Sequence, residues 1–361
     1  MNILVITPRF ALAGVPLAQF RFAEALAKEG HNVDFLIGFN EIEDAILKSK
    51  LVKIKILHKK HVRQMFFSIM NYLKNNTPDI IFSAEDHLNL LVLISAIFLK
   101  SKSKISCSSR VNPYDTFIKK NFAKAFILKF LNKIFAHRAN VLTCVSEGMV
   151  AQYKKIFPNL EYKCVYNIVD THSLTGTEEI KNEWLNNQYI KIISAGKLAE
   201  WKGFEYLIHA MVEVVSKYSN AKLLILGDGP LKEKLEKLIS NLNLNNNVRL
   251  VGYVNNPLDY FKKSDIFVLS SLVEGMPNVL VEAMMCGCTA VSTNCETGPG
   301  EIIQNEKNGY LVPIKNIEKL SEAIIQAIKK PISKSILAET VDPFSAKNVI
   351  QKHFKLLGLI D

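Results

Sequence analysis

The 361-residue sequence lacks the long apolar run that a membrane-spanning helix requires. Its longest apolar run, residues 90–99, is interrupted by Ser95 and reaches about half of the roughly 20 residues that a span needs. The N-terminus, MNILVITP, has neither the basic start nor the small-residue cleavage site of a signal peptide. We therefore expect a cytoplasmic protein without a membrane span.

Metal-binding patterns are also absent. The six cysteines form no C-x-x-C pair and have no histidine partners at zinc spacing, which predicts free thiols packed in the core. No aspartate belongs to a D-x-D triplet, so a divalent metal clamp on a nucleotide diphosphate has no obvious ligand pair. The sequence thus predicts a site that needs neither a metal nor a resident cofactor.

Several fingerprints of nucleotide-binding and nucleic-acid-binding proteins are missing. The first predicted strand is followed by PRFALAG instead of G-x-G-x-x-G, and no P-loop occurs, which disfavours nicotinamide-dependent enzymes and NTPases. Without a helix-turn-helix, an RNA-binding aromatic strand or a zinc finger, we expect no nucleic-acid partner. Disorder is excluded as well, because 48% of the residues are hydrophobic and 22% are charged, as in globular proteins.

Positive charge is concentrated in the first half of the chain. Residues 1–170 hold 24 Lys+Arg against 13 Asp+Glu, whereas residues 171–361 hold 21 of each, so the net charge of +11 belongs to the first half. Residues 116–146 contain no acidic residue and mix lysines with phenylalanines, as in helices that lie on a membrane surface. At helical spacing the lysines do not form one clean face. An anionic partner is indicated, with a solvated basic face as the alternative.

Strand-like and helix-like segments alternate along the chain, which predicts an α/β protein with parallel sheets covered on both faces. We predict two doubly wound, Rossmann-like domains, 1–170 and 171–343, that face one another across a ligand-binding cleft. Residues 344–361 are expected to form a C-terminal helix, for which one placement is against the N-terminal domain. The predicted strands are 3–7, 33–38, 54–57, 79–83, 104–108, 141–145, 163–168, 190–195, 222–226, 248–253, 266–270, 289–292 and 309–312.

The densest chemical signal is SLVEGMPNVLVEAMMCG, at 271–287. Glu274 lies in a loop after a predicted strand, Pro277 can begin a helix, and Glu282 falls in the second turn of that helix. Glu282 is the only charged residue within 279–288, and a carboxylate in apolar surroundings is costly unless something bonds it. A ribose diol would supply two hydroxyl donors, although a backbone amide or a lysine at the helix margin would satisfy the carboxylate too.

A second signal is AGKLAEWKG, at 195–203, which leaves a predicted strand through a tight turn. It presents Lys197 and Lys202, two ammonium groups that could hold a diphosphate and neutralise the charge that develops when the diphosphate departs. Surface lysines are common, so this spacing alone does not distinguish a binding site from a solvated turn.

Taken in order, these motifs resemble those of a known family. E-G-M-P-N-V-L-V-E at 274–282 resembles the paired-glutamate signature of the retaining GT-B glycosyltransferases called family 4, or glycosyl transferases group 1. Three further motifs fall in the family's order: the G-K-L and K-G pieces of 196–203, G-D-G-P-L at 227–231 and V-G-Y-V at 251–254. The resemblance covers nearly the whole chain and implies the GT-B fold.

The resemblance also implies roles for individual residues. Glu282 would bond the ribose of the nucleotide, and Glu274 would contact the transferred sugar and act in catalysis. Lys197 and Lys202 would bind the diphosphate, and Lys202 would act in catalysis by neutralising the leaving group. The resemblance implies further donor-binding residues. Gly14 would contact the donor in the first loop, and Val254 would lie beside the base. The backbone at a helix start would bind the donor through Met276, Pro277, Asn278, Val279 and Leu280.

Two positions depart from the family's pattern. The first loop has only Gly14 where relatives often have paired glycines. Arg110 follows a predicted strand at a place where many relatives have a histidine. An arginine cannot accept a hydrogen bond, but it can bind a phosphate or a sugar hydroxyl with two donors, so Arg110 is a further catalytic candidate.

The resemblance implies transfer of a hexose or N-acetylhexosamine, such as GalNAc, Gal or GlcNAc, from a UDP-sugar with retained configuration. T-G-P-G-E-I-I at 297–303 resembles a branch that builds bacterial lipid-linked oligosaccharides and O-antigens. With the basic first half, this implies a polyprenyl-diphosphate-linked saccharide as acceptor and peripheral attachment to the anionic inner face of the membrane. The alternatives are a sugar-nucleotide epimerase, a sugar phosphorylase, and a non-catalytic protein that binds nucleotide sugars or polyanions.

Overall fold

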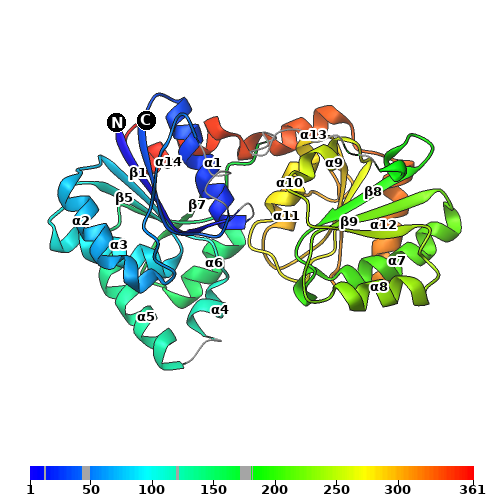
Figure 1. The fold of residues 1–361 in the computed structure, drawn as a ribbon, viewed down its shortest axis with the longest axis horizontal. Coiled ribbons are helices and arrows are strands. Elements are labelled where there is room, and N and C mark those ends of the chain that lie inside the picture. The colour runs from blue at the N-terminus through cyan, green and yellow to red at the C-terminus, as the bar shows by residue number, and fades with distance from the viewer. Residues whose placement is uncertain (12–13, 43–48, 119–121, 171–179, 181) are drawn as a thin grey trace. The chain divides into compact units, whose positions relative to one another are not determined.

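The computed structural model describes residues 1–11, 14–42, 49–118, 122–170, 180 and 182–361. Contacts divide the chain into two compact units, Met1–Val169 with Phe344–Asp361, and Asp170–Pro343 (Figure 1). Each unit consists of a parallel sheet with helices packed on its faces. The expected α/β class with two Rossmann-like sheets is therefore confirmed.

The sheet of the N-terminal unit has, in the described part of the chain, seven strands in the order β3-β2-β1-β4-β5-β6-β7. Three successive residues of the interior strand β1, Leu4, Val5 and Ile6, are fully buried, because a parallel strand of this kind is covered on both faces. The strands are β1 (Asn2–Phe10), β2 (Asn32–Asn40), β3 (Lys53–Ile56), β4 (Ile80–Ala84), β5 (Lys104–Ser109), β6 (Val141–Cys144) and β7 (Tyr162–Cys164).

Helices cover the two faces of this sheet. Adjacent residues of a strand point to opposite faces, so Ile81 and Phe82 of β4 show what packs on each side. Ile81 belongs to a buried cluster with residues of α2 and α3, whereas the ring of Phe82 contacts Phe22 of α1 and His353 of α14. The helices are α1 (Gly14–Lys28), α2 (Phe66–Asn75), α3 (Asp86–Phe98), α4 (Pro113–Phe117), α5 (Phe122–Phe135), α6 (Glu147–Ile156) and α14 (Ala346–Leu356).

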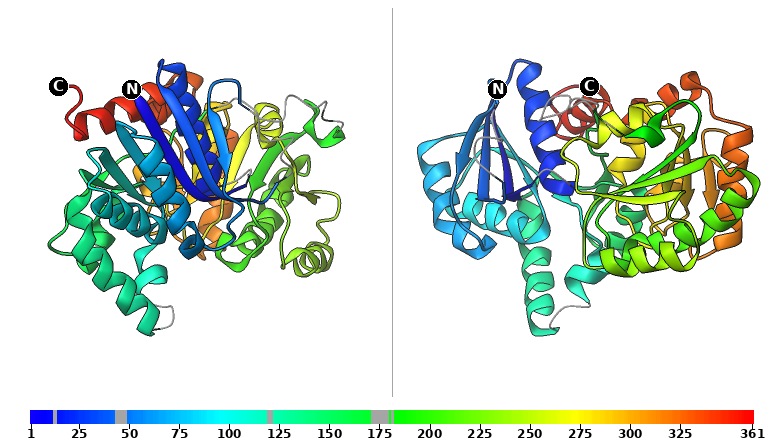
Figure 2. Two further views of the ribbon diagram at one scale, coloured as in Figure 1. Left: turned by 60° about the vertical axis from the view of Figure 1, so that its left-hand side comes forward. Right: turned by 45° about the vertical axis from the view of Figure 1, so that its right-hand side comes forward.

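The last helix, α14, packs beside α1 in the N-terminal unit (Figure 2). Lys104, at the start of β5, donates from Nζ to the carbonyl oxygens of Leu357 at 2.6 Å and Gly358 at 3.2 Å. A lysine in this position satisfies carbonyl groups that the helix end leaves without partners and complements the helix dipole. The chain end is thereby tied to the sheet of the N-terminal unit.

His353 of α14 is a buried histidine in an apolar environment. Its imidazole packs against the rings of Phe22 and Phe82, with centroid distances of 5.1 and 5.2 Å, and only 5% of the residue is exposed. Burial, reinforced by the positive charges of Arg110 and Lys352, lowers the pKa of His353 from 6.5 to about 3. The imidazole is therefore neutral at physiological pH.

The described part of the C-terminal unit has a parallel sheet of six strands in the order β10-β9-β8-β11-β12-β13. Its strands are β8 (Ile190–Ala195), β9 (Ala221–Leu226), β10 (Val248–Gly252), β11 (Ile266–Leu269), β12 (Thr289–Thr293) and β13 (Tyr310–Val312). Its helices are α7 (Phe204–Lys217), α8 (Lys232–Asn241), α9 (Pro257–Lys262), α10 (Asn278–Met285), α11 (Pro299–Ile302), α12 (Ile317–Lys329) and α13 (Lys334–Val341).

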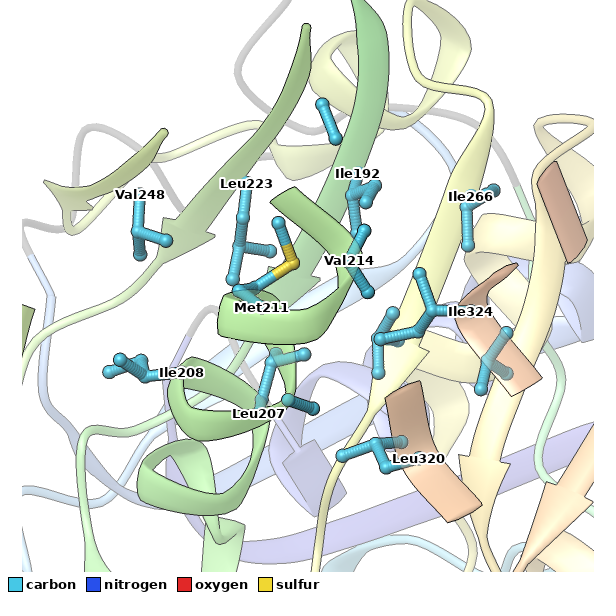
Figure 3. Close-up of a cluster of buried hydrophobic side chains, with 14 of the residues drawn as sticks. Ile192, Leu207, Ile208, Met211, Val214, Leu223, Val248, Ile266, Leu320 and Ile324 are labelled. Atoms are coloured by element: carbon cyan, nitrogen blue, oxygen red, sulfur yellow. The ribbon is translucent and has the colours of Figure 1, made fainter. Parts of the chain in front are cut away.

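The core of this unit lies between the sheet and the helices α7 and α12 (Figure 3). Leu207 and Met211 of α7 are one helical turn apart and fully buried, and they pack with Leu223 of β9. Leu320 and Ile324 of α12 are likewise one turn apart and join the same cluster. This spacing is that of an amphipathic helix whose apolar stripe faces a sheet.

Two predicted elements differ from the structure. A helix predicted over 117–138 is observed as α5 followed by a 3-10 turn at Ala136–Arg138; α4 ends at Phe117, and Lys119 and Lys120 lie outside the described residues. The strand expected over 163–168 is only Tyr162–Cys164, although the amide of Val165 still donates to Cys144.

All six cysteines are free thiols. In the described part of the chain, no helix combines the length and the hydropathy needed to cross a membrane.

Candidate functional site

The central pair of strands in the C-terminal sheet is β8 and β11, which are hydrogen-bonded neighbours. The chain continues from β8 to β9 on one side and from β11 to β12 on the other. In doubly wound sheets, such a switch point is where ligands bind, beyond the carboxyl ends of the strands. Lys197 and Lys202 follow β8, and Glu274 follows β11. The topology therefore places all three predicted residues after the two strands that form the switch point.

A tight turn fixes Lys202. Gly203, directly after it, has φ +60°, and a Cβ atom there would lie 2.2 Å from the carbonyl oxygen of Ser270, so only glycine fits. The Ser270 hydroxyl donates to the carbonyl oxygen of Lys202 at 2.9 Å. The aliphatic stem of Lys202 runs past Gly196, where an added Cβ would lie 3.4 Å from its Cε. The turn after β8 is thus built against the loop after β11.

Lys202 and Glu274 form a salt bridge. Nζ of Lys202 lies 2.5 Å from Oε1 of Glu274, and 17% and 11% of the two side chains are exposed. The Ser271 hydroxyl donates to the same Oε1 at 2.6 Å, and the Thr297 hydroxyl donates to the main-chain oxygen of Glu274. Oε2 of Glu274 accepts no hydrogen bond from the described residues. One carboxylate oxygen is therefore held by two donors, and the other is available to a ligand.

Glu282 lies in the middle of α10, and only 8% of it is exposed. Its neighbours Val281 and Ala283 are fully buried, as expected for a carboxylate surrounded by apolar residues. At the start of the same helix, Pro277 has no amide hydrogen, and the amides of Asn278 and Leu280 donate to the carbonyl oxygens of Met276 and Pro277. The amides of Met276 and Val279 donate to no described residue. Only these two of the five predicted positions therefore offer an unoccupied amide.

The loop 227–231 supports the turn that carries the lysines. A Cβ on Gly227, which has φ +131°, would lie 2.0 Å from the carbonyl oxygen of Gly196, and the amide of Leu198 donates to Asp228 at 2.9 Å. The glycines of G-D-G-P-L thus allow two backbones to touch. Lys197 is exposed, and its side chain forms no ion pair with a described residue. Val254, after β10, is half-buried.

The other two predicted residues, Arg110 and Gly14, belong to the N-terminal unit. Arg110 donates from Nη1 to Asn167 at 2.5 Å and from Nε to Ser108 at 3.2 Å, and its Nη2 donates to no described residue. Burial lowers the pKa of Arg110 to about 10, so the group remains cationic at neutral pH. Gly14 begins α1 with φ +62° and has open space where a Cβ would stand. It also follows β1, which pairs with β4 at the switch point of its own sheet.

Beside Arg110 lies a buried carboxyl group that the sequence did not predict. Asp86, at the start of α3, accepts hydrogen bonds from the hydroxyls of Ser109 at 2.6 Å and Tyr153 at 2.7 Å. Burial raises the pKa of Asp86, while the two hydrogen bonds act in the opposite direction. Because both donors belong to other elements of the sheet and its helices, this cluster ties α3 and α6 to the end of β5.

Among the described residues, no three His, Cys, Asp or Glu side chains are grouped so that they could hold a metal ion.

Sequence reasoning missed the residues that hold the predicted ones. Ser271 and Thr297 donate to Glu274, and Asn167 accepts from Arg110. A weak signal was available for Thr297, which begins the T-G-P-G-E-I-I segment that resembles a branch of the family. The polar side chains of Ser271 and Thr297 also follow predicted strands. Only the structure shows which predicted residue each one contacts.

The chain forms two Rossmann-like units, and in the second a lysine and a carboxylate are joined at the switch point, where ligands bind in doubly wound sheets. The family described as glycosyl transferases group 1 matches residues 176–341. An uncharacterized glycosyltransferase of Methanocaldococcus jannaschii is 34% identical over 289 residues, which are 76% of this chain and 70% of that protein. The chain belongs to the glycosyl transferases group 1 family.

Other relatives and solved structures agree. The N-acetylgalactosamine-N,N'-diacetylbacillosaminyl-diphospho-undecaprenol 4-alpha-N-acetylgalactosaminyltransferase of Campylobacter jejuni is 29% identical over 238 residues, which are 65% of this chain and 63% of that protein. HepE of Anabaena, solved in complex with UDP, has a TM-score of 0.79 at 15% identity, with 100% of both chains covered. The lipopolysaccharide outer core galactosyltransferase WaaB has a TM-score of 0.73 at 17% identity, with 99% of both covered. The chain is a glycosyltransferase of the GT-B type.

Proposed function

We propose that this glycosyltransferase moves a hexose or an N-acetylhexosamine from a UDP-sugar to a lipid-diphosphate-linked saccharide, with retained anomeric configuration and without a metal ion. The observation that carries the proposal is the contact between Lys202 and Glu274 at the switch point of the C-terminal unit. It joins a cation suited to a diphosphate with a carboxylate suited to a sugar hydroxyl. The solved complexes of HepE with UDP and with UDP-glucose support the choice of donor, because they share this fold.

The donor is proposed to bind through three kinds of group in the C-terminal unit. The ammonium groups of Lys197 and Lys202 bind the diphosphate, Lys202 by using N–H donors that its single bond to Glu274 leaves available. The unoccupied amides of Met276 and Val279 bind an anion at the start of α10, where the helix dipole favours negative charge. Glu282 accepts from the ribose hydroxyls, since a carboxylate bonds a diol with two charge-assisted hydrogen bonds. Val254 contacts the base.

Catalysis is proposed to rest on departure of the diphosphate. Lys202 neutralises the negative charge that develops on the leaving oxygen, which lowers the barrier because the cation is already in place. Glu274 accepts from a hydroxyl of the donor sugar with Oε2 and so orients the ring relative to the acceptor. The departing phosphate oxygen takes the proton of the attacking acceptor hydroxyl on the same face of the sugar, and the configuration is retained.

The acceptor is proposed to approach the N-terminal unit, which carries the net positive charge. The Campylobacter relative is named for a diphospho-undecaprenol-linked substrate, and this supports a lipid-diphosphate-linked saccharide here. Arg110 contributes Nη2 to a phosphate or a sugar hydroxyl, while Ser108 and Asn167 hold the rest of its guanidinium group. A guanidinium group that is fixed on two sides loses little side-chain entropy when a ligand binds.

We also propose that α5 attaches the protein to the inner face of the membrane. This helix packs on the unit through Ala125, Leu128 and Asn132, all of which are buried. Its other faces combine basic and large apolar side chains in water, a combination typical of helices that lie on anionic membranes. The exposed residues of this α5 surface are Lys124, Phe126, Ile127, Phe130, Lys133 and Ile134.

A UDP-release screen tests the proposed function. The full chain is incubated with a panel of UDP-sugars and a polyprenyl-diphosphate-linked saccharide without added metal, and the configuration of the product is determined. We expect UDP release that depends on the acceptor and a product that keeps the donor's anomeric configuration. An altered sugar still attached to UDP would instead indicate an epimerase, and a sugar 1-phosphate released from the saccharide when inorganic phosphate is supplied would indicate a phosphorylase. UDP-sugar binding without turnover on any acceptor of this class would indicate a binding protein.

A further inference from the structure

The loop that carries Glu274 is tied to the segment 293–298, which follows β12. The Thr297 hydroxyl donates to the main-chain oxygen of Glu274, and only 4% of Thr297 is exposed. Gly298 also packs closely against this loop: a Cβ added to Gly298 would lie only 2.9 Å from the carbonyl oxygen of Gly275. The backbone of Glu274 is thus held from a neighbouring strand, independently of its bond to Lys202.

The side chain of Glu274 is held separately by Ser271, and Ser271 is itself fixed from β12. The Ser271 hydroxyl donates to Oε1 of Glu274 at 2.6 Å, and only 1% of Ser271 is exposed. The main-chain oxygen of Ser271 accepts from the Thr293 hydroxyl at 2.5 Å and the Cys295 thiol at 3.1 Å. These contacts leave Ser271 little freedom to move away from the carboxylate.

We propose that Ser271 and Thr297 are positioning residues for Glu274. This proposal rests on the proposed function. Ser271 fixes the carboxylate rotamer through Oε1, and Thr297 fixes the main chain that carries it. Together they keep Oε2 directed to the donor sugar while Lys202 shares its hydrogens between Glu274 and the diphosphate. Neither residue touches the nucleotide.

The need for such residues follows from the double role of Lys202. When the diphosphate binds, Lys202 shares its hydrogens with it, and the bond from Lys202 to Glu274 weakens. A glutamate has three rotatable side-chain bonds, so without another donor the carboxylate would rotate away from the sugar. A misplacement of about 1 Å at a reacting group can cost up to about a hundredfold in rate. Hydroxyl donors that do not bind the diphosphate keep the carboxylate in place throughout.

The test compares a pair of variants that differ by one hydroxyl. Thr297→Val keeps the shape of threonine and removes the hydroxyl, whereas Thr297→Ser keeps the hydroxyl and removes a methyl group. We expect Thr297→Val and Ser271→Ala to lower kcat about tenfold, with the Kd for UDP within a factor of two of wild type. Thr297→Ser is expected to retain most of kcat. Ser321→Ala is the control, because it removes another buried hydroxyl that bonds a backbone oxygen within α12, outside the site.

A double-mutant cycle separates positioning from general loosening of the fold. In a Glu274→Gln background, which lacks the carboxylate, Thr297→Val and Ser271→Ala are expected to lower kcat no further. An equal loss in both backgrounds, or a loss of UDP binding that accompanies the fall in kcat, would overturn the proposal. So would wild-type kcat in both single variants. If wild type itself releases no UDP, the proposed function fails, whereas a fully active wild type with unaffected variants refutes only this inference.

Discussion

Lys202 and Glu274 are 72 positions apart in the sequence, yet Nζ of the lysine lies 2.5 Å from Oε1 of the glutamate. They follow β8 and β11, the neighbouring strands from which the chain leaves in opposite directions. In the protein without a ligand, the carboxylate neutralises the cation that the donor diphosphate is proposed to bind. Under the proposed function, the diphosphate would share this lysine with Glu274, and the sugar and the leaving group would be linked through one ion pair.

The two glutamates of the paired signature are expected to behave differently when they are changed. Glu282→Ala removes the acceptor proposed for the ribose, so the affinities for UDP and for uridine should both fall by about tenfold or more. Glu274→Gln should leave UDP affinity within a factor of two and lower kcat. Calorimetric titrations with both ligands, together with the UDP-release assay, measure these effects. Equal effects of the two substitutions on binding and on kcat would contradict the assigned roles.

Gly203 is expected to be intolerant of any side chain. Gly203→Ala places a Cβ 2.2 Å from the carbonyl oxygen of Ser270 at φ +60°, so the turn must open and Lys202 must shift. We expect unfolding free energy to fall by about 2 kcal/mol or more. Gly358→Ala is the matched control, since Gly358 has φ +61° and its added Cβ would meet only the end of the Lys104 side chain at 3.9 Å. Equal losses for both variants in urea unfolding would show that the contact with Ser270 is unimportant.

His353 is expected to make the N-terminal unit sensitive to acid. Its pKa is lowered from 6.5 to about 3 in the folded chain, so the unfolded state binds a proton first as pH falls. The stability present above pH 6.5 is therefore lost progressively between about pH 6.5 and pH 3. Between pH 6.5 and 5.0 the loss should approach about 2 kcal/mol.

Urea unfolding of the full chain at several pH values measures this dependence. His353→Phe should flatten it, whereas His58→Asn, at an exposed histidine with φ +54°, should not. A wild-type slope that His353→Phe leaves unchanged would show that other groups are responsible.

The α5 surface is expected to bind anionic membranes. Phe126→Ser with Phe130→Ser removes apolar side chains that are 63% and 55% exposed, and the double variant should sediment about tenfold less with vesicles containing phosphatidylglycerol. Ile336→Ser, which removes an apolar side chain 40% exposed in the C-terminal unit, is the control. High salt should weaken binding of the wild type. Equal sedimentation of all three proteins would place the membrane contact elsewhere or exclude it.

Most of the fold could be predicted from the sequence because parallel α/β sheets leave a strong local pattern. Buried strands read as short apolar runs, and all thirteen predicted strands overlap most of an observed one. The prediction was less accurate where tertiary contacts determine the end of a strand. The strand predicted over 163–168 pairs with β6 only as far as Cys164, after which a last hydrogen bond joins the amide of Val165 to the carbonyl oxygen of Cys144.

The site could be predicted only in part. Lys202, Glu274 and Glu282 stand out by charge and position, but no local pattern reports that Lys202 and Glu274 touch, since the contact depends on which strands are neighbours. Ser271 and Thr297 are ordinary hydroxyl residues whose roles come from the partner they contact. Which of the amides at 276–280 are unoccupied depends on local turns that the sequence does not reveal. Pro277, however, could have been excluded as an amide donor from the sequence alone, because proline has no amide hydrogen.

The central claim is that Lys202, held by Glu274, binds the diphosphate of a nucleotide sugar. Its most direct test is a pair of calorimetric titrations, with UDP and with uridine, on wild type and on Lys202→Met. Lys234→Met serves as the control, because Lys234 pairs with Glu205 on the exposed surface of the same unit. The account predicts that Lys202→Met weakens UDP by about tenfold or more, spares uridine within a factor of two, and that the control changes neither. Equal losses for UDP and uridine, or unchanged UDP affinity, would contradict it.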